Sequence, residues 1–328
     1  MVRALVSIVL GVVLGGCAGA MQGPPLETLA DGRVGTIAFR TVTVAPRQAP
    51  LGERGDATVI TGELALPPDA AGSLPAVVLI HGAGGVQDYH HLWARELRAI
   101  GLATFIVDSF AGRGIGRIVE NLEAINVGSR ILDAFRALEM LATHPRIDRE
   151  RVALMGFSHG GVTTLYASVV RFQQSYLRAG LEFAAYLPFY AYCNTRLIDD
   201  DRVSRRPIRL FHGTADDDTP IEPCRQWVTR ARAAGADVDL REYALAPHGF
   251  DNPRLPPALR NHHAVNPSRC FFVERARGDV VNAETGQPLS YHDACWSRGA
   301  TVGYDPRAYA DALATVKAFL TANFALGR

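Results

Sequence analysis

The sequence predicts an α/β fold in which a mostly parallel central sheet carries helices on both faces. Two observations predict it. Short apolar runs typical of buried strands alternate with longer helical stretches along the chain. The 328 residues are also 48% hydrophobic, which is enough to bury a full core. The run 76–80 is continuously apolar, as expected for a strand covered on both faces.

The expected elements follow in chain order. Two stretches with strand alternation, 34–44 and 57–67, predict an antiparallel edge of the sheet. Further strands are expected at 76–80, 102–107, directly before Ser158, and at 183–190, 208–211 and 238–243. Helices are expected at 87–100, 118–143, 162–168, 221–234 and 306–324. The segment 251–304 is rich in Pro, Asn and Gly and predicts an insertion that decorates a single domain spanning 34–328.

The N-terminus predicts a targeting segment. Arg3 precedes an apolar run over 4–14 that is too short to span a bilayer. This run ends in Leu-Gly-Gly-Cys17, which resembles a bacterial lipobox, in which the cysteine is lipidated and becomes the first mature residue. An ordinary secretory peptide cleaved near 18–20 is the alternative.

We therefore expect a signal peptide over 1–16 and a tether over 17–33. The mature protein is expected on the periplasmic side of a bacterial membrane, held there through a lipid on Cys17. Ala18, in place of Asp behind the cysteine, favours the outer membrane.

The remaining cysteines form an even set in a compartment where disulfides persist. We predict the pairs Cys193–Cys224 and Cys270–Cys295. Each would close a loop of a few tens of residues and stabilise the fold by about 3–4 kcal/mol in the chain-entropy model. Reduced, buried cysteines are the alternative.

The motif Gly156-Phe157-Ser158-His159-Gly160 lies between an apolar strand and a predicted helix. This layout is typical of a nucleophile elbow, a turn so tight that glycines flank the serine. The hydroxyl is then held clear of the sheet. In the alternative interpretation, Ser158 only caps the helix of a glycine-rich turn.

Two further polar motifs follow strands at the same predicted edge of the sheet, where open α/β sheets bind ligands. A serine hydroxyl needs a base, and His248 is the candidate. Asp216, the first of three consecutive aspartates, would orient the imidazole. We expect Asp217 and Asp218 to lie in a solvated turn.

A metal site formed by the three aspartates with His212 is a further alternative. Consecutive residues cannot all point at one ion, so we predict neither a metal nor a cofactor. An oxyanion would be bound by the backbone N–H of His159 and by one from Ala83 or Gly84. His81 and His212 are expected to be packed structural residues.

These motifs, with His212-Gly213-Thr214-Ala215-Asp216 and His248-Gly249-Phe250, resemble the dienelactone hydrolase family of α/β-hydrolases. The resemblance covers roughly 75–250 and 302–324, and the chain order Ser, Asp, His is that of α/β-hydrolases. It implies cleavage of esters and lactones through an acyl-enzyme, without a cofactor. It also selects Asp216, which lies four residues before Pro220.

Two features qualify the resemblance. Founding members carry cysteine as the nucleophile, so Ser158 implies a serine esterase rather than lactone specificity. Arg113 lies where the family keeps an arginine that grips the substrate carboxylate, which makes it a candidate substrate-binding residue. A structural arginine that pairs with a loop carboxylate is the alternative.

The composition argues against a nucleic-acid-binding protein. A net charge of +1 gives no broad attraction to nucleic acid. The expected partners are a small-molecule ester and, through Cys17, a membrane.

A peptidase of the prolyl-oligopeptidase type shares the order of the triad, but such enzymes carry a large extra domain for which this chain has no room. A non-catalytic binding lipoprotein on the same fold is the other alternative.

Overall fold

The computed structural model describes residues 24–46, 48–53, 55–68 and 70–327. The predicted signal peptide, Cys17 and the first part of the tether lie outside the described residues. Within this part of the chain, no helix is both long enough and apolar enough to cross a membrane.

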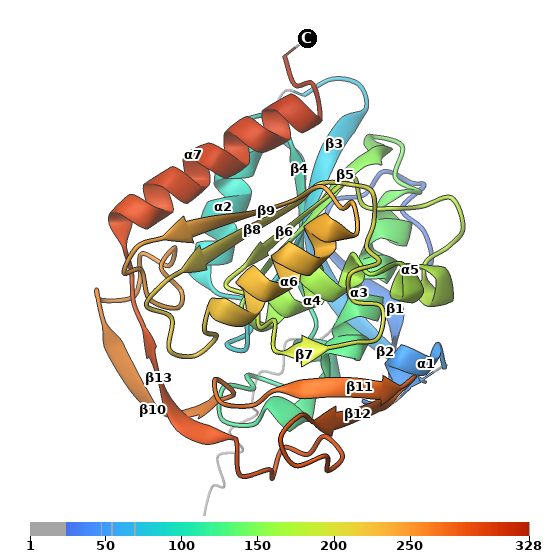
Figure 1. The fold of residues 1–328 in the computed structure, drawn as a ribbon. Helices are drawn as coiled ribbons and strands as arrows, with labels where there is room; N and C mark the ends of the chain where they lie inside the picture. Colours follow the sequence, from blue (N-terminus) through green and yellow to red (C-terminus); the bar gives the residue numbers. More distant parts are fainter. Residues whose placement is uncertain (1–23, 47, 54, 69, 328) are drawn as a thin grey trace, which may run out of the picture.

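The core is an eight-stranded sheet (Figure 1). Its strands lie in the order β1 (Gly35–Thr43), β2 (Asp56–Ala65), β4 (Ala103–Asp108), β3 (Leu74–Ile80), β5 (Ile147–Phe157), β6 (Ala185–Phe189), β8 (Ile208–Gly213) and β9 (Val238–Tyr243). β2 pairs antiparallel with both β1 and β4, and every other pairing in this sheet is parallel. The prediction of a mostly parallel sheet with an antiparallel N-terminal edge is therefore confirmed.

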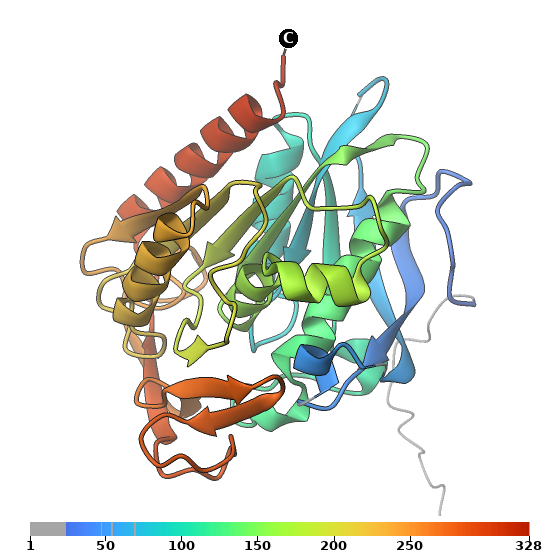
Figure 2. The same cartoon turned by 45° about the vertical axis from the view of Figure 1, so that its right-hand side comes forward.

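Each face of the sheet is covered by its own set of helices (Figures 1 and 2). Strand β3 is buried along its whole length, and its side chains alternate between the two faces. Val77 and Leu79 belong to the hydrophobic cluster of α2 (Asp88–Arg98) and α7 (Pro306–Asn323). Val78 and Ile80 belong to the cluster of α3 (Val127–Leu141), α4 (His159–Ala167), α5 (Val170–Tyr176) and α6 (Glu222–Ala233).

The predicted helix over 118–143 is wrong in its first third. α3 begins only at Val127, and short 3₁₀ turns occupy 111–113 and 122–124. The reason is local capping, because the side chain of Asn126 accepts a hydrogen bond from the backbone N–H of Ser129 at 3.0 Å. The structure also adds α5 and a short α1 (Gln48–Leu51), which the sequence pattern did not predict.

The insertion forms two small sheets that lie below the central sheet in Figure 1. β10 (Leu259–Asn266) pairs with β13 (Ser297–Val302), and β11 (Phe272–Ala276) pairs with both β12 (Asp279–Asn282) and β7 (Thr195–Arg196). We call 259–302 the roof segment, since it covers the carboxyl ends of the central strands.

Both predicted disulfides are present, Cys193–Cys224 and Cys270–Cys295. The second lies within the roof segment. A buried ion pair also ties this segment to the core, because Arg171 of α5 contacts Glu274 of β11 at 2.9 Å. The roof segment is therefore cross-linked within itself by a disulfide and fixed to the domain by a buried ion pair. The disulfides also indicate an oxidising, exported environment.

Candidate active site

Ser158 lies at the turn between β5 and α4 with a φ of 54°, in the left-handed region that residues with side chains rarely adopt. The neighbouring glycines explain how this turn fits. A Cβ on Gly156 would meet the carbonyl oxygen of Gly160, and one on Gly160 would meet that of Ile80. The local sequence therefore forms the predicted elbow, with the first turn of α4 directly behind the hydroxyl.

The structure brings the three candidate catalytic side chains together. Nε2 of His248 lies 2.9 Å from Oγ of Ser158, and Nδ1 of His248 lies 2.7 Å from Oδ2 of Asp216. They meet because β5, β8 and β9 run parallel, so the segments that follow these strands share one edge of the sheet.

Asp216 is itself held by Thr219. Its Oδ1 accepts from the backbone N–H of Thr219 at 2.7 Å, and its Oδ2 accepts from the Thr219 hydroxyl at 2.9 Å. Because this carboxylate is fixed beside Nδ1 of His248, the neutral imidazole carries its proton on Nδ1. Nε2 is then free to accept the proton of the Ser158 hydroxyl.

Carboxylates surround His248. Burial alone would lower its pKa, but Asp216, Asp218 and Asp251 outweigh burial and raise the pKa of His248 to about 9. Oδ2 of Asp218 lies 3.8 Å from Nε2 of His248, and burial raises the pKa of the Asp218 carboxyl to about 6. In turn, His248 helps to hold the pKa of Asp216 below its ordinary value, against the effect of burial.

The expectation of a solvated turn is wrong for Asp218, whereas the side chain of Asp217 is 43% exposed and also has specific partners. The side chain of Asp218 is only 20% exposed and faces the imidazole of His248. Asp217 binds the roof segment, accepting from the backbone N–H of Thr301 at 2.7 Å and pairing with Arg260 at 2.5 Å. Of the three consecutive aspartates, Asp216 contacts Nδ1 of His248, Asp217 binds the roof segment, and Asp218 places a carboxylate near Nε2 of His248.

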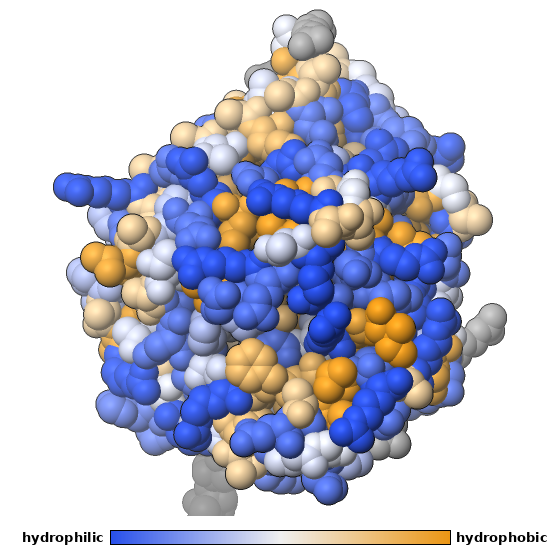
Figure 3. Space-filling view, viewed as in Figure 1, coloured by the Kyte–Doolittle hydropathy of each residue, from blue (hydrophilic) through white to orange (hydrophobic). Residues whose placement is uncertain are grey.

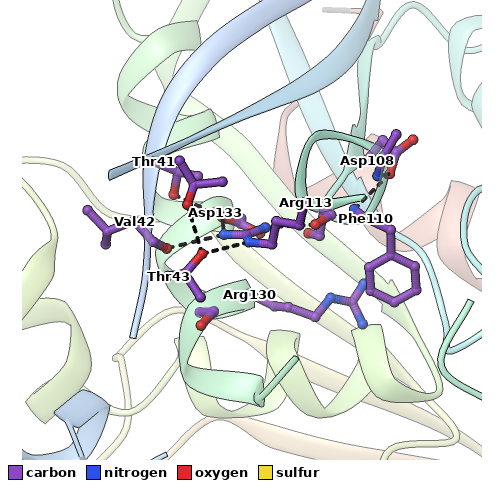
Figure 4. A network of polar contacts seen from close by, with 12 residues as sticks. Thr41, Val42, Thr43, Asp108, Phe110, Arg113, Arg130 and Asp133 are labelled. Atoms are coloured by element: carbon purple, nitrogen blue, oxygen red, sulfur yellow. Dashed lines mark hydrogen bonds and ion pairs between the residues drawn. The ribbon is translucent and has the colours of Figure 1, made fainter. Parts of the chain in front are cut away.

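Arg130 is a fully buried cation next to residues 81–85, which contain the predicted oxyanion residues Ala83 and Gly84 and which we call the oxyanion loop. Its guanidinium donates to Nδ1 of His159 at 2.7 Å and to the carbonyl oxygen of His81. Its side chain lies beside the ring of Phe110 in Figure 4, with the guanidinium carbon 5.1 Å from the ring centroid. Among the described residues, it makes no ion pair with a carboxylate, and burial lowers the pKa of Arg130 to about 9. It therefore remains charged at neutral pH.

The contact with Arg130 fixes the protonation of His159. A guanidinium only donates hydrogen bonds, so Nδ1 of His159 is the acceptor and the ring carries its proton on Nε2. Burial and the charge of Arg130 hold the pKa of His159 well below its usual value. The ring is therefore neutral, and His159 lines the cavity beside Ser158.

The predicted oxyanion residues also lie at this point. Ala83, Gly84 and His159 line the same cavity as Ser158. The loop is held by the backbone N–H of Ile118, which donates to the carbonyl oxygen of Ala83 at 2.8 Å. As the first residue of α4, His159 has a backbone N–H with no acceptor inside the helix, so this group is available to a ligand.

The substrate-binding role expected of Arg113 has no support in this structure. Its guanidinium donates to both carboxylate oxygens of Asp133, at 2.8 and 2.9 Å, and to the hydroxyl of Thr43 at 2.9 Å (Figure 4). Its side chain is 6% exposed, and it is not among the residues that line the cavity. Arg113 is thus the structural arginine of the alternative, although its partner belongs to helix α3.

Tyr190 and Asp251, which were not predicted from the sequence, lie behind His248. Tyr190 has a φ of 35°, and its ring packs edge-on against His248 with 4.7 Å between centroids. Its hydroxyl donates to Asp251 at 2.7 Å, and Nε1 of Trp93 donates to the other oxygen of Asp251, also at 2.7 Å. Burial raises the pKa of Asp251 to about 6. Its place three residues after His248 was the only signal in the sequence.

The triad opens on a cavity of about 780 Å³. Its walls come from α1, from the start of α3, and from the roof segment. No group of three or more His, Cys, Asp or Glu side chains in the described ranges is placed to hold a metal ion.

The fold and this elbow define the class of the protein, which is an α/β-hydrolase. The model of the dienelactone hydrolase family matches residues 60–323, and the chain belongs to that family. It is therefore a hydrolase. No curated protein matches the sequence.

Solved structures agree on the fold. One is a dienelactone hydrolase-like promiscuous phosphotriesterase, P91, from metagenomic libraries, with a TM-score of 0.55 and 18% identity over 88% of this chain and 98% of that chain. A structure named m3DLH has a TM-score of 0.57 and 22% identity over 89% of this chain and 99% of that chain.

Proposed function

We propose that this protein is a serine hydrolase that cleaves carboxylic esters through an acyl-enzyme on Ser158. The observation that carries the proposal is the chain of hydrogen bonds from Ser158 to His248 to Asp216, with distances of 2.9 and 2.7 Å. The three side chains come from separate segments of the chain. A serine bonded to an imidazole that is bonded to a carboxylate is the arrangement that activates a serine hydroxyl.

The reaction follows from these contacts. Nε2 of His248 takes the Ser158 proton while Oγ attacks the ester carbonyl carbon, and the carbonyl oxygen becomes an oxyanion. The backbone N–H groups of His159 and of Ala83 or Gly84 stabilise that oxyanion. The imidazolium then protonates the departing alcohol. Water, deprotonated by His248, attacks the acyl-enzyme and releases the acid and the free serine.

Hydrolysis of p-nitrophenyl butyrate tests this function. The wild-type protein should turn over the ester and react with a fluorophosphonate probe. Ser158→Ala should lose both properties and keep its melting temperature. Ser175→Ala, which changes an exposed serine of α5, should keep both. Ester turnover by Ser158→Ala at the wild-type rate would refute the assignment.

We also propose that the mature chain begins at Cys17 and is held to a membrane by a lipid on that residue. The support is the lipobox-like sequence together with the two disulfides of an exported protein. Cys17→Ser should move the protein from the membrane fraction to the soluble fraction of cells. Persistent membrane association of this variant would contradict the proposal.

A further inference from the structure

The cavity beyond Ser158 is large and apolar, which bears on the kind of acyl group that it accepts. Its volume of about 780 Å³ lies in the upper part of the range for pockets that bury whole drug-sized ligands. A small lactone would leave most of it unfilled. From the core side, the cavity is lined by apolar side chains that include Ile131, Val162 and Phe172.

The roof segment supplies the opposite wall. Phe272, Val280, Leu289 and Trp296 all line the cavity. These residues come from β11, from β12 and from the loop before β13, so the wall exists only because the insertion folds back over the sheet. The face in Figure 3 is mainly hydrophilic, and hydrophobic side chains gather on its lower half, over the region of β7, β11 and α1 in Figure 1.

The charges around the cavity disfavour an anion. Two arginines line it, but Arg117 pairs with Glu120 at 2.7 Å and Arg260 pairs with Asp217 at 2.5 Å. Asp218 lies beside the catalytic imidazole, where its carboxylate would repel a negatively charged acyl group. Arg113 is bound to Asp133 outside the cavity. Within the described residues, no arginine at this cavity is left without a carboxylate partner.

The wall is built before any ligand arrives. The ion pair of Arg171 with Glu274 and the contact of Asp217 with Thr301 hold the roof segment to the rest of the domain, and the disulfide Cys270–Cys295 cross-links the segment within itself. A preformed apolar wall binds ligand without the cost of ordering a loop. Burial of apolar surface therefore contributes directly to affinity.

We propose that the preferred substrates are uncharged esters with a long or bulky apolar acyl group, which lies between the core and the roof segment. The proposal rests on the function proposed above and names its substrate class. Each methylene that the cavity buries should raise kcat/KM by roughly fourfold until the space is filled. An anionic acyl group of the same length should be a poor substrate.

A series of p-nitrophenyl esters tests the proposal. From acetate through butyrate to octanoate, kcat/KM should rise by at least about tenfold. The half-ester of glutarate, which carries a free carboxylate, should be at least about tenfold poorer than the neutral hexanoate. If acetate equals octanoate, or if the glutarate half-ester exceeds hexanoate, the substrate class is wrong.

Two tryptophan substitutions locate the acyl group. Val280→Trp fills the cavity from β12 and should abolish the preference for octanoate, while acetate hydrolysis and fluorophosphonate labelling persist. Val273→Trp changes the same residue type on neighbouring β11, outside the cavity lining, and should keep the preference. An unchanged chain-length preference in a folded Val280→Trp protein would contradict the proposed position.

The two proposals fail in different ways. If Ser158 reacts with the probe and short esters are hydrolysed without a preference for long ones, only the substrate class fails. If Ser158 does not react and no ester is turned over, the proposed function itself fails. The wild-type ester series alone decides the substrate class, even if a tryptophan variant does not fold.

Discussion

Two buried charged clusters flank Ser158, and they shift histidine pKa values in opposite directions. On one side, the acidic cluster of Asp216, Asp218 and Asp251 surrounds His248 and raises its pKa to about 9. On the other side, burial and Arg130 hold the pKa values of His81 and His159 well below the usual value. Burial lowers the pKa in all three rings, so the sign of the neighbouring charge decides the result.

This difference matches the two demands of ester cleavage. The ring that would receive the serine proton in the proposed mechanism lies among carboxylates, which stabilise an imidazolium. The loop that would face the oxyanion lies beside a buried guanidinium and neutral rings, which favour negative charge. The opposite pKa shifts of these histidines come from charged residues on other segments, above all Arg130 of α3. The histidines alone could not produce them.

The largest effect is expected from loss of the base. His248→Ala should lower kcat for p-nitrophenyl butyrate by about 10⁴-fold or more, because among the described residues His248 is the only ring that hydrogen-bonds to the Ser158 hydroxyl. Stopped-time assays at high protein concentration measure this loss. His263→Ala, which changes an exposed histidine of β10, is the control and should act like the wild type.

A smaller loss is expected from the opposite cluster. Arg130→Met should lower kcat by about 10²-fold with little change in KM, because the cation acts on the oxyanion loop rather than on the bound substrate. Arg130→Lys should restore part of the rate. Arg136→Met on the same helix, where the arginine pairs with Glu139 and Glu27, should keep kcat. If a folded Arg130→Met protein keeps full kcat, the electrostatic comparison fails.

The pH dependence of kcat/KM tests the effect of the carboxylates around His248. In the proposed mechanism neutral His248 is the active form, so kcat/KM should rise with pH through the raised pKa of about 9. Asp218→Asn removes one of the carboxylates that stabilise the imidazolium, so the midpoint should move to lower pH by about one unit. Activity at neutral pH should then increase. Asp237→Asn, far from the site and exposed, should leave the midpoint unchanged.

The smallest effect on ester hydrolysis is expected from loss of the disulfide in the roof segment. The double variant Cys270→Ser with Cys295→Ser should lower the free energy of unfolding by about 3–4 kcal/mol in the chain-entropy model. It should leave acetate hydrolysis nearly intact, because neither residue touches the triad. Urea unfolding followed by tryptophan fluorescence measures the change. An unfolding midpoint equal to that of the wild type would contradict a structural role for this disulfide.

The elbow and its partners were predictable because their signals are local. Glycines flank Ser158, and the candidate residues follow strands whose ends a parallel sheet must place together. Arg130, Arg113 and the roles of Asp217 and Asp218 were not predictable. A helical arginine has the same local pattern whether it faces solvent or the core, and its burial depends on how α3 packs. The roof segment has no clear periodicity, so its contacts with the site appear only in the folded chain.

The central claim is that Ser158 carries the acyl group. Acid quenching during the first turnover of p-nitrophenyl butyrate, followed by peptide mass spectrometry, tests it most directly. The account predicts a butyryl group on the peptide that contains Ser158, and no such group in Ser158→Ala. Steady turnover with the acyl group on another residue, or with Ser158 unmodified throughout, would contradict it.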